Sequence, residues 1–207
     1  MDFPEVVRFH GHVCPGLAMG FRAASLAVCE LAMQRAGDDE LIAIVENASC
    51  AVDAIQAVAG CTAGKGNLIL RDYGKQVYTF IRRGDGVALR LAVRWMPAPD
   101  GPEAASAWSR FEQGDRSAEV LQVIAERKGQ KAKAILEAPD SELFFIARPV
   151  VPVPEPARVH PTVSCSICGE RVMKPRAKRG MDGAYTCVPC QQQRETLGHS
   201  QLGVPQC

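Results

Sequence analysis

Apolar residues recur at steps of three and four between Leu17 and Ala32, and this spacing predicts a long helix with one buried face. Because proline suits the first helical position, we expect the helix to begin at Cys14-Pro15 and to end before Gly37. Patterns of the helical and the extended kind continue along the chain. They predict further helices at 5–11, 50–59, 103–113 and 117–128, and strands at 41–45, 67–70, 77–82, 87–93 and 143–147.

These helices and strands follow one another in mixed order, which predicts an α+β core domain over residues 1–148. The turn at Arg83-Gly84-Asp85-Gly86 separates two of the strands and is typical of a hairpin. No repeat of the pattern is visible, so we expect a single core and not an array of repeated units.

A proline-rich segment over residues 149–161 follows the core domain and contains five prolines. Proline at this density favours an extended conformation that rises ~3.1 Å per residue. Such a segment reaches ~40 Å, which is enough for the remaining chain to dock on a neighbouring subunit. We favour the simpler interpretation, a spacer between two domains of one monomer.

Composition narrows the class of protein. The formal net charge of the 207 residues is only +1, so no global positive field favours nucleic acid or an anionic membrane. The N-terminus lacks the apolar stretch of a signal peptide, and no apolar run approaches the ~18 residues of a membrane span. Nine cysteines in such a chain indicate thiols and metal ligands, and we expect a cytoplasmic protein.

Four of these cysteines, Cys165, Cys168, Cys187 and Cys190, form two C-x2-C pairs. The pairs are spaced as in two-knuckle zinc sites, and four thiolates complete a tetrahedral shell, so we predict a structural zinc. Gly169 suits a knuckle turn, whereas Cys190 runs into a helix-forming segment, which predicts a treble-clef finger over residues 162–207. Rubredoxin-type iron and redox disulfides are the weaker alternatives. His160, His199 and Cys207 lie outside the array.

The segment between the two cysteine pairs is basic, with Arg171, Lys174, Arg176, Lys178 and Arg179. One interpretation is a contact surface for phosphate or nucleic acid. The other is a solvated face of a small domain, which we favour because no aromatic residue is interleaved in the basic run. Nucleic acid is therefore not an expected partner.

A second chemical pattern lies near the N-terminus, where His10, His12 and Cys14 alternate. In an extended stretch, alternate side chains point to the same side, so all three can face one pocket. Cys14 also precedes a helix, whose N-terminal dipole lowers the pKa of a thiol and favours the thiolate. We expect these residues to serve function and not only packing.

Two further segments carry candidate residues. Cys50 and Asp53 are three apart on an expected helix and so share a face. The run from Gly60 to Asn67 resembles a phosphate loop, but three residues, not four, precede Gly64-Lys65, and Gly66 replaces the Ser or Thr. We instead expect a tight loop that presents Cys61 and the Lys65 ammonium to a pocket.

At these segments the chain resembles the E-subunit family of formylmethanofuran dehydrogenase. The resemblance covers roughly the first hundred residues, and the cysteine finger is similar to that of longer family members. The matching motifs are Phe9-His10-Gly11-His12, Cys14-Pro15-Gly16-Leu17, Gly20, Arg22, Cys50-Ala51-Val52-Asp53-Ala54-Ile55-Gln56, Gly60-Cys61-Thr62, Gly64-Lys65-Gly66-Asn67-Leu68, Asp72 and Gly74-Lys75.

The resemblance implies an α+β domain that forms homodimers and a groove with a metal-binding active site. Carried over to this chain, the ligands are His12, Cys14 and Cys61, with His10, Cys50 and Asp53 as secondary candidates. The ion would be a second zinc or another transition metal with an open position, and Asp53 or Lys65 would transfer protons. Implied partners are dehydrogenase subunits, and the implied role is accessory to one-carbon or molybdenum/tungsten enzyme chemistry.

An alternative hypothesis from a different class is a metal-sensing adaptor or regulatory protein. In that case the N-terminal site would bind the metal, and the finger would report its presence to a protein or nucleic-acid partner. The two hypotheses share the same ligands and differ in what the finger contacts.

Overall fold

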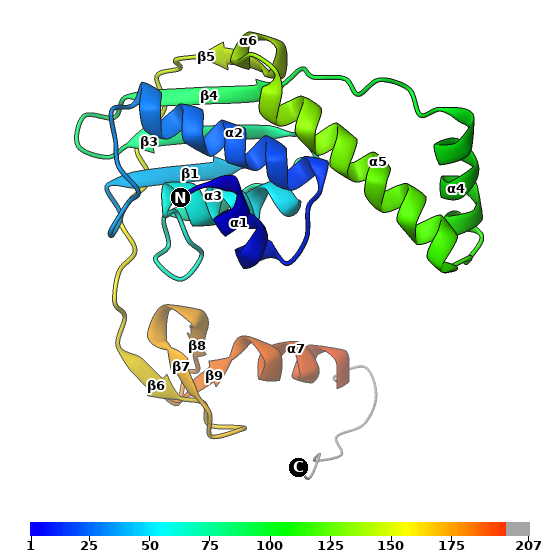
Figure 1. The fold of residues 1–207 in the computed structure, drawn as a ribbon. Helices are drawn as coiled ribbons and strands as arrows, with labels where there is room; N and C mark the ends of the chain where they lie inside the picture. The colour runs from blue at the N-terminus through cyan, green and yellow to red at the C-terminus, as the bar shows by residue number, and fades with distance from the viewer. Residues whose placement is uncertain (198–207) are drawn as a thin grey trace. The chain divides into compact units, whose positions relative to one another are not determined.

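The structure, a computed structural model, describes residues 1–197 and divides the chain into two compact units, Met1–Ala157 and Arg158–Cys207 (Figure 1). The division falls inside the segment 149–161 for which the proline content predicted a linker. His199 and Cys207 lie outside the described residues.

The first unit is built on a five-stranded sheet in the order β2-β1-β3-β4-β5. Edge strand β2 is parallel to β1, and the other neighbours are antiparallel, with the hairpin between β3 and β4 at the predicted turn. All five predicted strands are present, as β1 (Leu41–Val45), β2 (Leu68–Leu70), β3 (Val77–Arg82), β4 (Ala88–Val93) and β5 (Phe144–Ala147).

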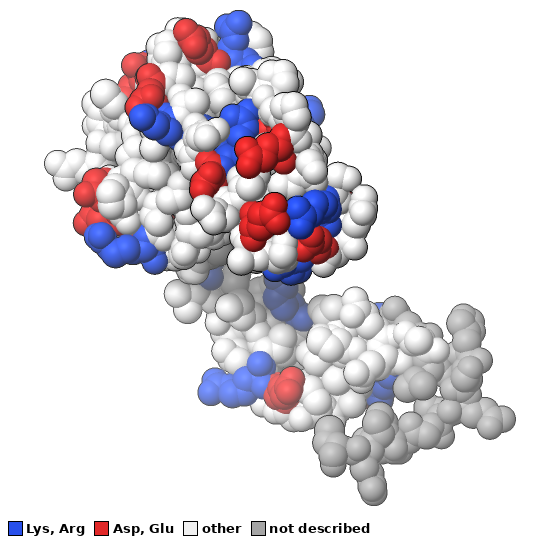
Figure 2. Space-filling model, turned by 45° about the vertical axis from the view of Figure 1, so that its right-hand side comes forward, with Lys and Arg blue, Asp and Glu red and all other residues white. Residues whose placement is uncertain are grey.

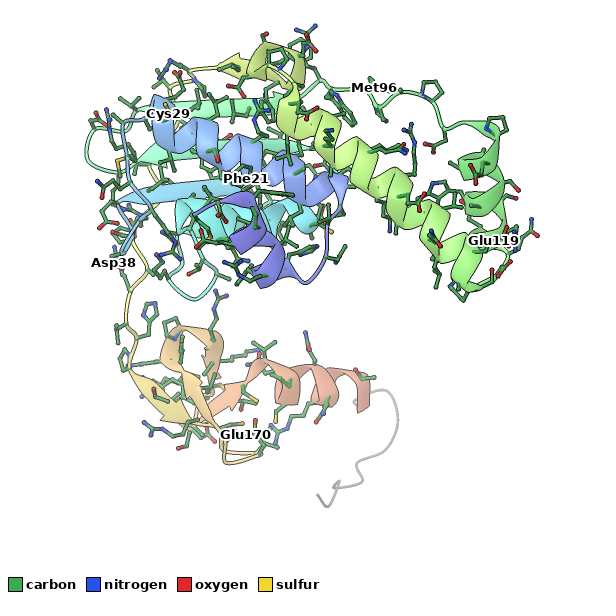
Figure 3. The ribbon with its side chains drawn as sticks, viewed as in Figure 1. Phe21, Cys29, Asp38, Met96, Glu119 and Glu170 are labelled. Atoms are coloured by element: carbon green, nitrogen blue, oxygen red, sulfur yellow. The ribbon has the colours of Figure 1, made fainter. Side chains whose placement is uncertain are left out.

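Helices α2 (Pro15–Glu30) and α3 (Cys50–Ala59) form a layer on one face of the sheet (Figure 1). The alanine-rich inner faces of both helices pack on Leu41, Ala43, Tyr78, Phe80 and Leu89 in one buried core. Helix α1 (Phe3–His10) packs on the outer side of this layer, where Phe3 and Phe21 meet edge to face with ring centroids 5.4 Å apart (Figure 3). The α+β class predicted from the sequence is confirmed.

The opposite face of the sheet carries a second apolar cluster of Ile42, Ile44, Ile81 and Ala88. Val151, from the proline-rich segment, packs against this cluster, and the Arg83 guanidinium donates to the Pro154 carbonyl at 2.6 Å. Residues up to Ala157 therefore belong to the first unit as a strap on its sheet. The free spacer expected over the whole of 149–161 is reduced to its last residues.

A helical arm is formed by α4 (Pro102–Glu112) and α5 (Ala118–Glu137), which pack through Ala107, Val120 and Ile124. Figure 3 labels Glu119 near the turn between them. Helix α5 is longer than the predicted 117–128, because its second half buries Ala132 and Ile135 in the core. Arg22 caps its end by donating to the carbonyls of Ile135, Leu136 and Ala138, and the short helix α6 (Asp140–Leu143) follows.

The second unit consists of two small hairpins and a helix, the treble-clef arrangement predicted from the cysteine spacing. Its elements are β6 (Thr162–Ser164), β7 (Arg171–Met173), the 3₁₀ turn η1 (Lys174–Arg176), β8 (Ala177–Arg179), β9 (Tyr185–Cys187) and α7 (Val188–Leu197). The hairpins pair β6 with β7 and β8 with β9.

Among the described residues, no helix combines the length and the apolar character that crossing a bilayer requires. Figure 2 shows acidic and basic side chains interspersed over the visible face of the first unit. The surface of this unit is therefore mixed in charge.

Candidate metal centres

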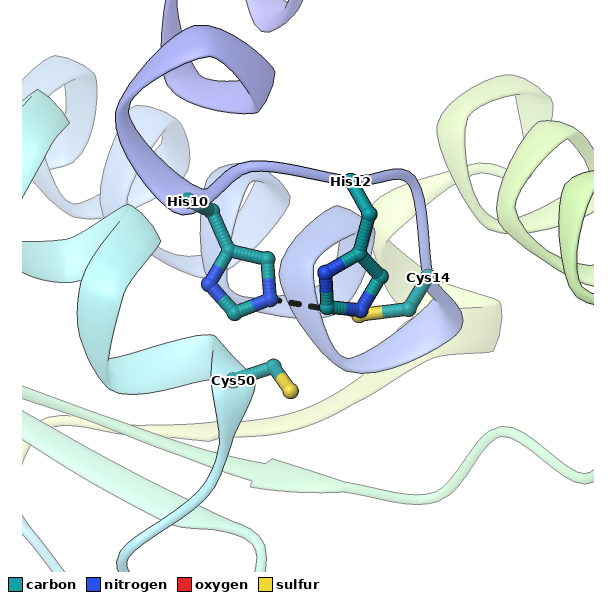
Figure 4. Close-up of side chains that lie close together, drawn as sticks. All are labelled: His10, His12, Cys14 and Cys50. Carbon is teal, nitrogen blue, oxygen red and sulfur yellow. Dashed lines mark hydrogen bonds between the residues drawn. The ribbon is translucent and has the colours of Figure 1, made fainter.

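Four potential metal ligands converge where α1, α2 and α3 meet (Figure 4). They are His10 at the end of α1, His12 in the following turn, Cys14 before α2, and Cys50 at the start of α3. One donor atom from each lies within 4.8 Å of the others. Two imidazoles and two thiols at this separation are a donor set that suits a tetrahedral transition-metal ion. We call this set the core cluster.

The turn that presents His10 and His12 is encoded by the residues around it. Helix α1 starts with a reciprocal cap between Asp2 and Glu5 and ends at Gly11, whose φ of 99° few other residues adopt. Cys14 is the N-cap of α2, and its Sγ accepts a hydrogen bond from the Leu17 N–H at 3.4 Å. A thiol in this position is stabilised as thiolate by the helix N-terminus, as the sequence predicted.

Two glycines on α2 bring Cys50 to this turn. A Cβ at Gly20 would lie 2.2 Å from the Ala51 carbonyl oxygen, and a Cβ at Gly16 would lie 3.3 Å from the Cys50 Cβ. Helices α2 and α3 thus approach more closely than side chains at these positions would allow. The family motif residues Gly16 and Gly20 place the first turn of α3 beside Cys14.

Asp53 orients His10 within the core cluster. Its carboxylate lies 2.7 Å from His10 Nδ1, while the other ring nitrogen, Nε2, lies 3.9 Å from Cys14 Sγ. A carboxylate on one imidazole nitrogen fixes the tautomer and leaves the other nitrogen for a metal. The His10 side chain is only 9% exposed, so its orientation is held by packing as well.

The two histidines differ in their surroundings. The His12 residue is exposed to solvent, and its ring faces that of His10 with centroids 4.4 Å apart. Cys14 is buried and Cys50 half-buried, and burial together with the adjacent Cys14 thiol raises the pKa of Cys50. The cluster therefore has a buried side made by His10 and the two thiols, and a solvent side made by His12.

The structure does not bring Cys61 and Lys65 to the core cluster. Cys61 is fully buried in the main core, its Sγ donates to the Leu41 carbonyl at 3.2 Å, and burial raises its pKa to about 12. The Lys65 ammonium donates to the carbonyls of Ala36 and Gly37 at 3.0 and 3.4 Å. The loop that was expected to present both groups to a pocket instead secures the chain before β1.

Asn67 and Gly60 explain why this loop is rich in fixed residues. The Asn67 amide donates to the carbonyls of Asp38 and Leu41, both at 2.9 Å, and its oxygen accepts the Thr62 N–H. Gly60 has a φ of 73°, and a Cβ there would lie 2.5 Å from the Ala36 carbonyl oxygen. The motif from Gly60 to Asn67 is thus accounted for by backbone hydrogen bonding.

Cys50, which the sequence placed second to Cys61, is the cysteine that the structure joins to Cys14. One signal in the sequence pointed to it, because Cys50 opens a helix as Cys14-Pro15 does. What the sequence lacked was the pairing of these two helix starts, which depends on the close contact at Gly20.

An open cavity of about 550 Å³ lies beside the core cluster. His10 and Cys50 reach it from the cluster, and Asp53 and Gln56 line it from α3. The remaining wall is mainly aliphatic and comes from β1, β2 and α3, with Val45, Val52, Leu68 and Leu70. The volume falls in the range of small-molecule sites.

In the second unit, Cys165, Cys168, Cys187 and Cys190 also place their sulfurs within 4.8 Å of one another. Gly169, with a φ of 75°, closes the first knuckle, and Cys190 lies in the first turn of α7. Backbone N–H groups, that of Cys168 first, lower the pKa of Cys165 to about 6, as expected for a thiolate ligand. We call this set the finger cluster.

Fold and clusters together define a two-module protein in which an α+β core carries a mixed histidine and cysteine cluster and a treble-clef module carries four cysteines. Residues 9–145 match the family model described as "FmdE, Molybdenum formylmethanofuran dehydrogenase operon", and the chain belongs to this family. The resemblance noted in the sequence is thereby confirmed.

Two relatives give further comparison. A "Probable S-adenosyl-L-methionine-binding protein" of Archaeoglobus fulgidus is 33% identical over 193 residues, which are 88% of this chain and 50% of that protein. The chain thus spans about half the length of this relative. The crystal structure of an FmdE-like protein of the tungsten formylmethanofuran dehydrogenase type, from Syntrophus aciditrophicus, has the same fold, with a TM-score of 0.58 at 21% identity, covering 98% of this chain and 96% of that one.

Proposed function

We propose that this protein binds one transition-metal ion, zinc by the donor chemistry, at the core cluster and uses it on a small molecule in the adjoining cavity. The observation that carries the proposal is the convergence of His10, His12, Cys14 and Cys50 within 4.8 Å, with Asp53 holding His10. Zinc in a Cys2His set retains a fourth position that water or substrate can take.

The exposure of the ligands decides which of them is exchangeable. His10, Cys14 and Cys50 are held by helices and packing, whereas His12 lies on an exposed turn. We infer that the first three are permanent ligands and that His12 yields its position to an incoming ligand. A zinc ion in such a site polarises a bound oxygen or lowers the pKa of bound water.

Residues of this chain supply the remaining steps. Asp53 keeps the His10 imidazole in the tautomer whose Nε2 faces the ion, and its partly exposed carboxylate can take up a proton from a molecule in the cavity. Gln56 donates to Asp53 at 3.4 Å and holds that carboxylate at the cavity wall.

Family membership supports the setting of this chemistry. An accessory role beside molybdenum or tungsten one-carbon enzymes, in contact with dehydrogenase subunits, follows from the family's description and is part of the proposal. The same holds for the homodimer and for the cytoplasmic location. Light scattering of the purified protein tests the dimer directly, since a molecular mass of one chain contradicts it.

The test of the proposed site is metal content per chain, by elemental analysis of protein purified without chelator. We expect two ions in the native chain and one in both Cys14→Ser and Cys50→Ser. Cys61→Ser is the critical comparison, because a ligand role for Cys61 predicts one ion and the core-cluster assignment predicts two. Cys29→Ser, which alters an exposed cysteine of neither cluster, is the matched control. Two ions in Cys14→Ser would contradict the proposal.

A second candidate function, the adaptor, has one observation in its favour. Residues 158–207 carry seven lysines and arginines against three acidic residues, a formal net charge of +4, whereas the first unit has seventeen against twenty. Lys178 and Arg194 also line a hollow of about 250 Å³ with Thr186 and Gln191. Two cations around a hollow suit a phosphate group.

Fluorescence anisotropy with labelled duplex DNA and RNA tests this candidate. Binding that weakens at least tenfold in Lys178→Glu/Arg194→Glu, and that falls steeply with salt, supports an adaptor role. Lys128→Glu/Lys133→Glu on the helical arm is the control with the same charge change. Equal binding by the two double variants contradicts the adaptor.

A further inference from the structure

The cavity beside the core cluster has a composition that restricts what it can bind. Its β-sheet wall is formed by Val45, Leu68 and Leu70, and its α3 wall by Val52, Asp53 and Gln56. Leu70 lies on edge strand β2 and is 53% exposed, although it is a large apolar side chain. Burial of such exposed aliphatic surface contributes about 25 cal/mol per Å² to binding, so the cavity favours a ligand with an apolar body.

The charges around the cavity are one-sided. Among the residues that the structure describes, no lysine or arginine lines it, and the one carboxylate that does is Asp53. The basic residue of the neighbouring loop, Lys65, is held by the carbonyls of Ala36 and Gly37. A ligand that brings a second negative charge into this space would lose hydration without gaining a cationic partner.

One end of the cavity meets the core cluster through His10 and Cys50, and the other extends along the aliphatic wall of β2. From this arrangement we propose that the site takes a small organic molecule with an uncharged, largely apolar body and one Lewis-basic end group directed at His10 and Cys50. Phosphorylated and dicarboxylate molecules are excluded. This inference rests on the proposed function for the role of the end group, but its ligand preference follows from the walls alone.

A pair of probes separates the two elements of the inference. Benzohydroxamic acid has a metal-binding end and a neutral body, and 4-carboxybenzohydroxamic acid adds one negative charge at the far end. We expect the cobalt-loaded protein to bind the neutral probe at least tenfold more tightly, as read from the cobalt absorption bands. A tenfold preference corresponds to about 1.4 kcal/mol. Equal affinity, or a preference for the charged probe, would overturn the inference.

The wall itself is tested by Leu70→Lys, which adds a cation at the cavity without altering the core cluster. We expect the preference to fall below threefold, because the lysine pairs with the added carboxylate. Leu121→Lys is the matched control, since Leu121 is similarly exposed at 42% but lies on the helical arm. An unchanged preference in Leu70→Lys, or an equal change in both variants, would overturn the assignment to this cavity.

A second readout does not depend on the metal. Methyl NMR spectra of the protein without added cobalt should show the neutral probe shifting the signals of Leu68, Leu70 and Val52 more than the charged probe does. If the core cluster takes up no cobalt, the proposed function fails, while the methyl shifts still decide the ligand preference. Shifts of methyl groups elsewhere, with none at these three residues, would overturn the inference.

Discussion

The two clusters differ in what surrounds them although both have four donors within 4.8 Å. The finger cluster uses sulfur alone, has three buried cysteines, and belongs to a unit whose buried apolar cluster consists of those cysteines with Val172 packed beside them. The core cluster mixes nitrogen and sulfur, borders a cavity, and sits on helices that a separate hydrocarbon core already holds. The finger therefore depends on metal to fold, and the core cluster has a fold that does not need the metal. A metal site that the fold can spare is the one available for chemistry.

The largest effect expected from this comparison follows metal removal. A strong chelator should unfold the finger, because structural zinc contributes about 10–16 kcal/mol of binding free energy to such modules. The first unit should keep its dispersed amide signals in an NMR spectrum of the whole chain. Loss of both sets of signals together would show that the core also requires metal, and the contrast between the clusters would then fail.

The next effect concerns the contact between α2 and α3. Gly20→Ala would place a Cβ 2.2 Å from the Ala51 carbonyl, so the helices must separate, and we expect a loss of about 3 kcal/mol in unfolding free energy. Cys50 would move away from Cys14, and the core cluster would lose its metal while the finger kept its own. Urea unfolding and elemental analysis measure the two outcomes.

Gly129→Ala is the matched control for that variant. Gly129 lies within α5 with nothing within 4 Å of an added Cβ, so alanine should stabilise the protein by about 1 kcal/mol through its helix propensity. If both variants behave alike, close packing at Gly20 is not what forms the core cluster.

A smaller effect is expected at the group behind the ligands. Asp53→Asn keeps the size of the side chain but removes the charge that orients His10, and affinity for the core metal should fall about 10- to 100-fold. Stability of the metal-free protein should change little, because Asp53 is partly exposed. Competition with a chromophoric chelator gives the affinity, and Glu119→Gln on the helical arm is the control. Full affinity in Asp53→Asn would remove Asp53 from the site.

The smallest effect distinguishes the two cysteines that the sequence ranked differently. Burial raises the pKa of Cys61 to about 12, so near pH 8 its thiolate fraction is negligible and iodoacetamide should not label it. Exposed Cys29 should be labelled at once, and Cys50 only after the core metal is removed. Peptide mass spectrometry follows each site. Rapid labelling of Cys61 in the folded protein would contradict its place in the core.

Most of the fold was accessible from local patterns. Pro15 after Cys14, Gly60 after α3 and the turn before β4 mark ends that depend only on neighbouring residues, and the structure has each of them where predicted. The second half of α5 was missed because its periodicity is weak. Its helical state depends on Arg22 and on burial against the core, which are distant in sequence.

The candidate site divided in the same way. His10, His12 and Cys14 are close in sequence, and their convergence follows from one turn. The fourth ligand comes from another helix, and two cysteines, Cys50 and Cys61, flank that helix at its two ends. Only the helix contact at Gly20 selects Cys50, and a single sequence does not state which helices touch.

The strap formed by Val151 and Pro154 has a consequence for how the two modules can be parted. A chain cut after residue 148 would leave Ile42, Ile44 and Ile81 on an uncovered sheet face, and such a fragment would tend to aggregate. A cut after Ala157 keeps that face sealed and frees the finger intact. The natural joint at which recombination can exchange one finger for another therefore lies nine residues beyond the last core strand and its arginine, at Arg158.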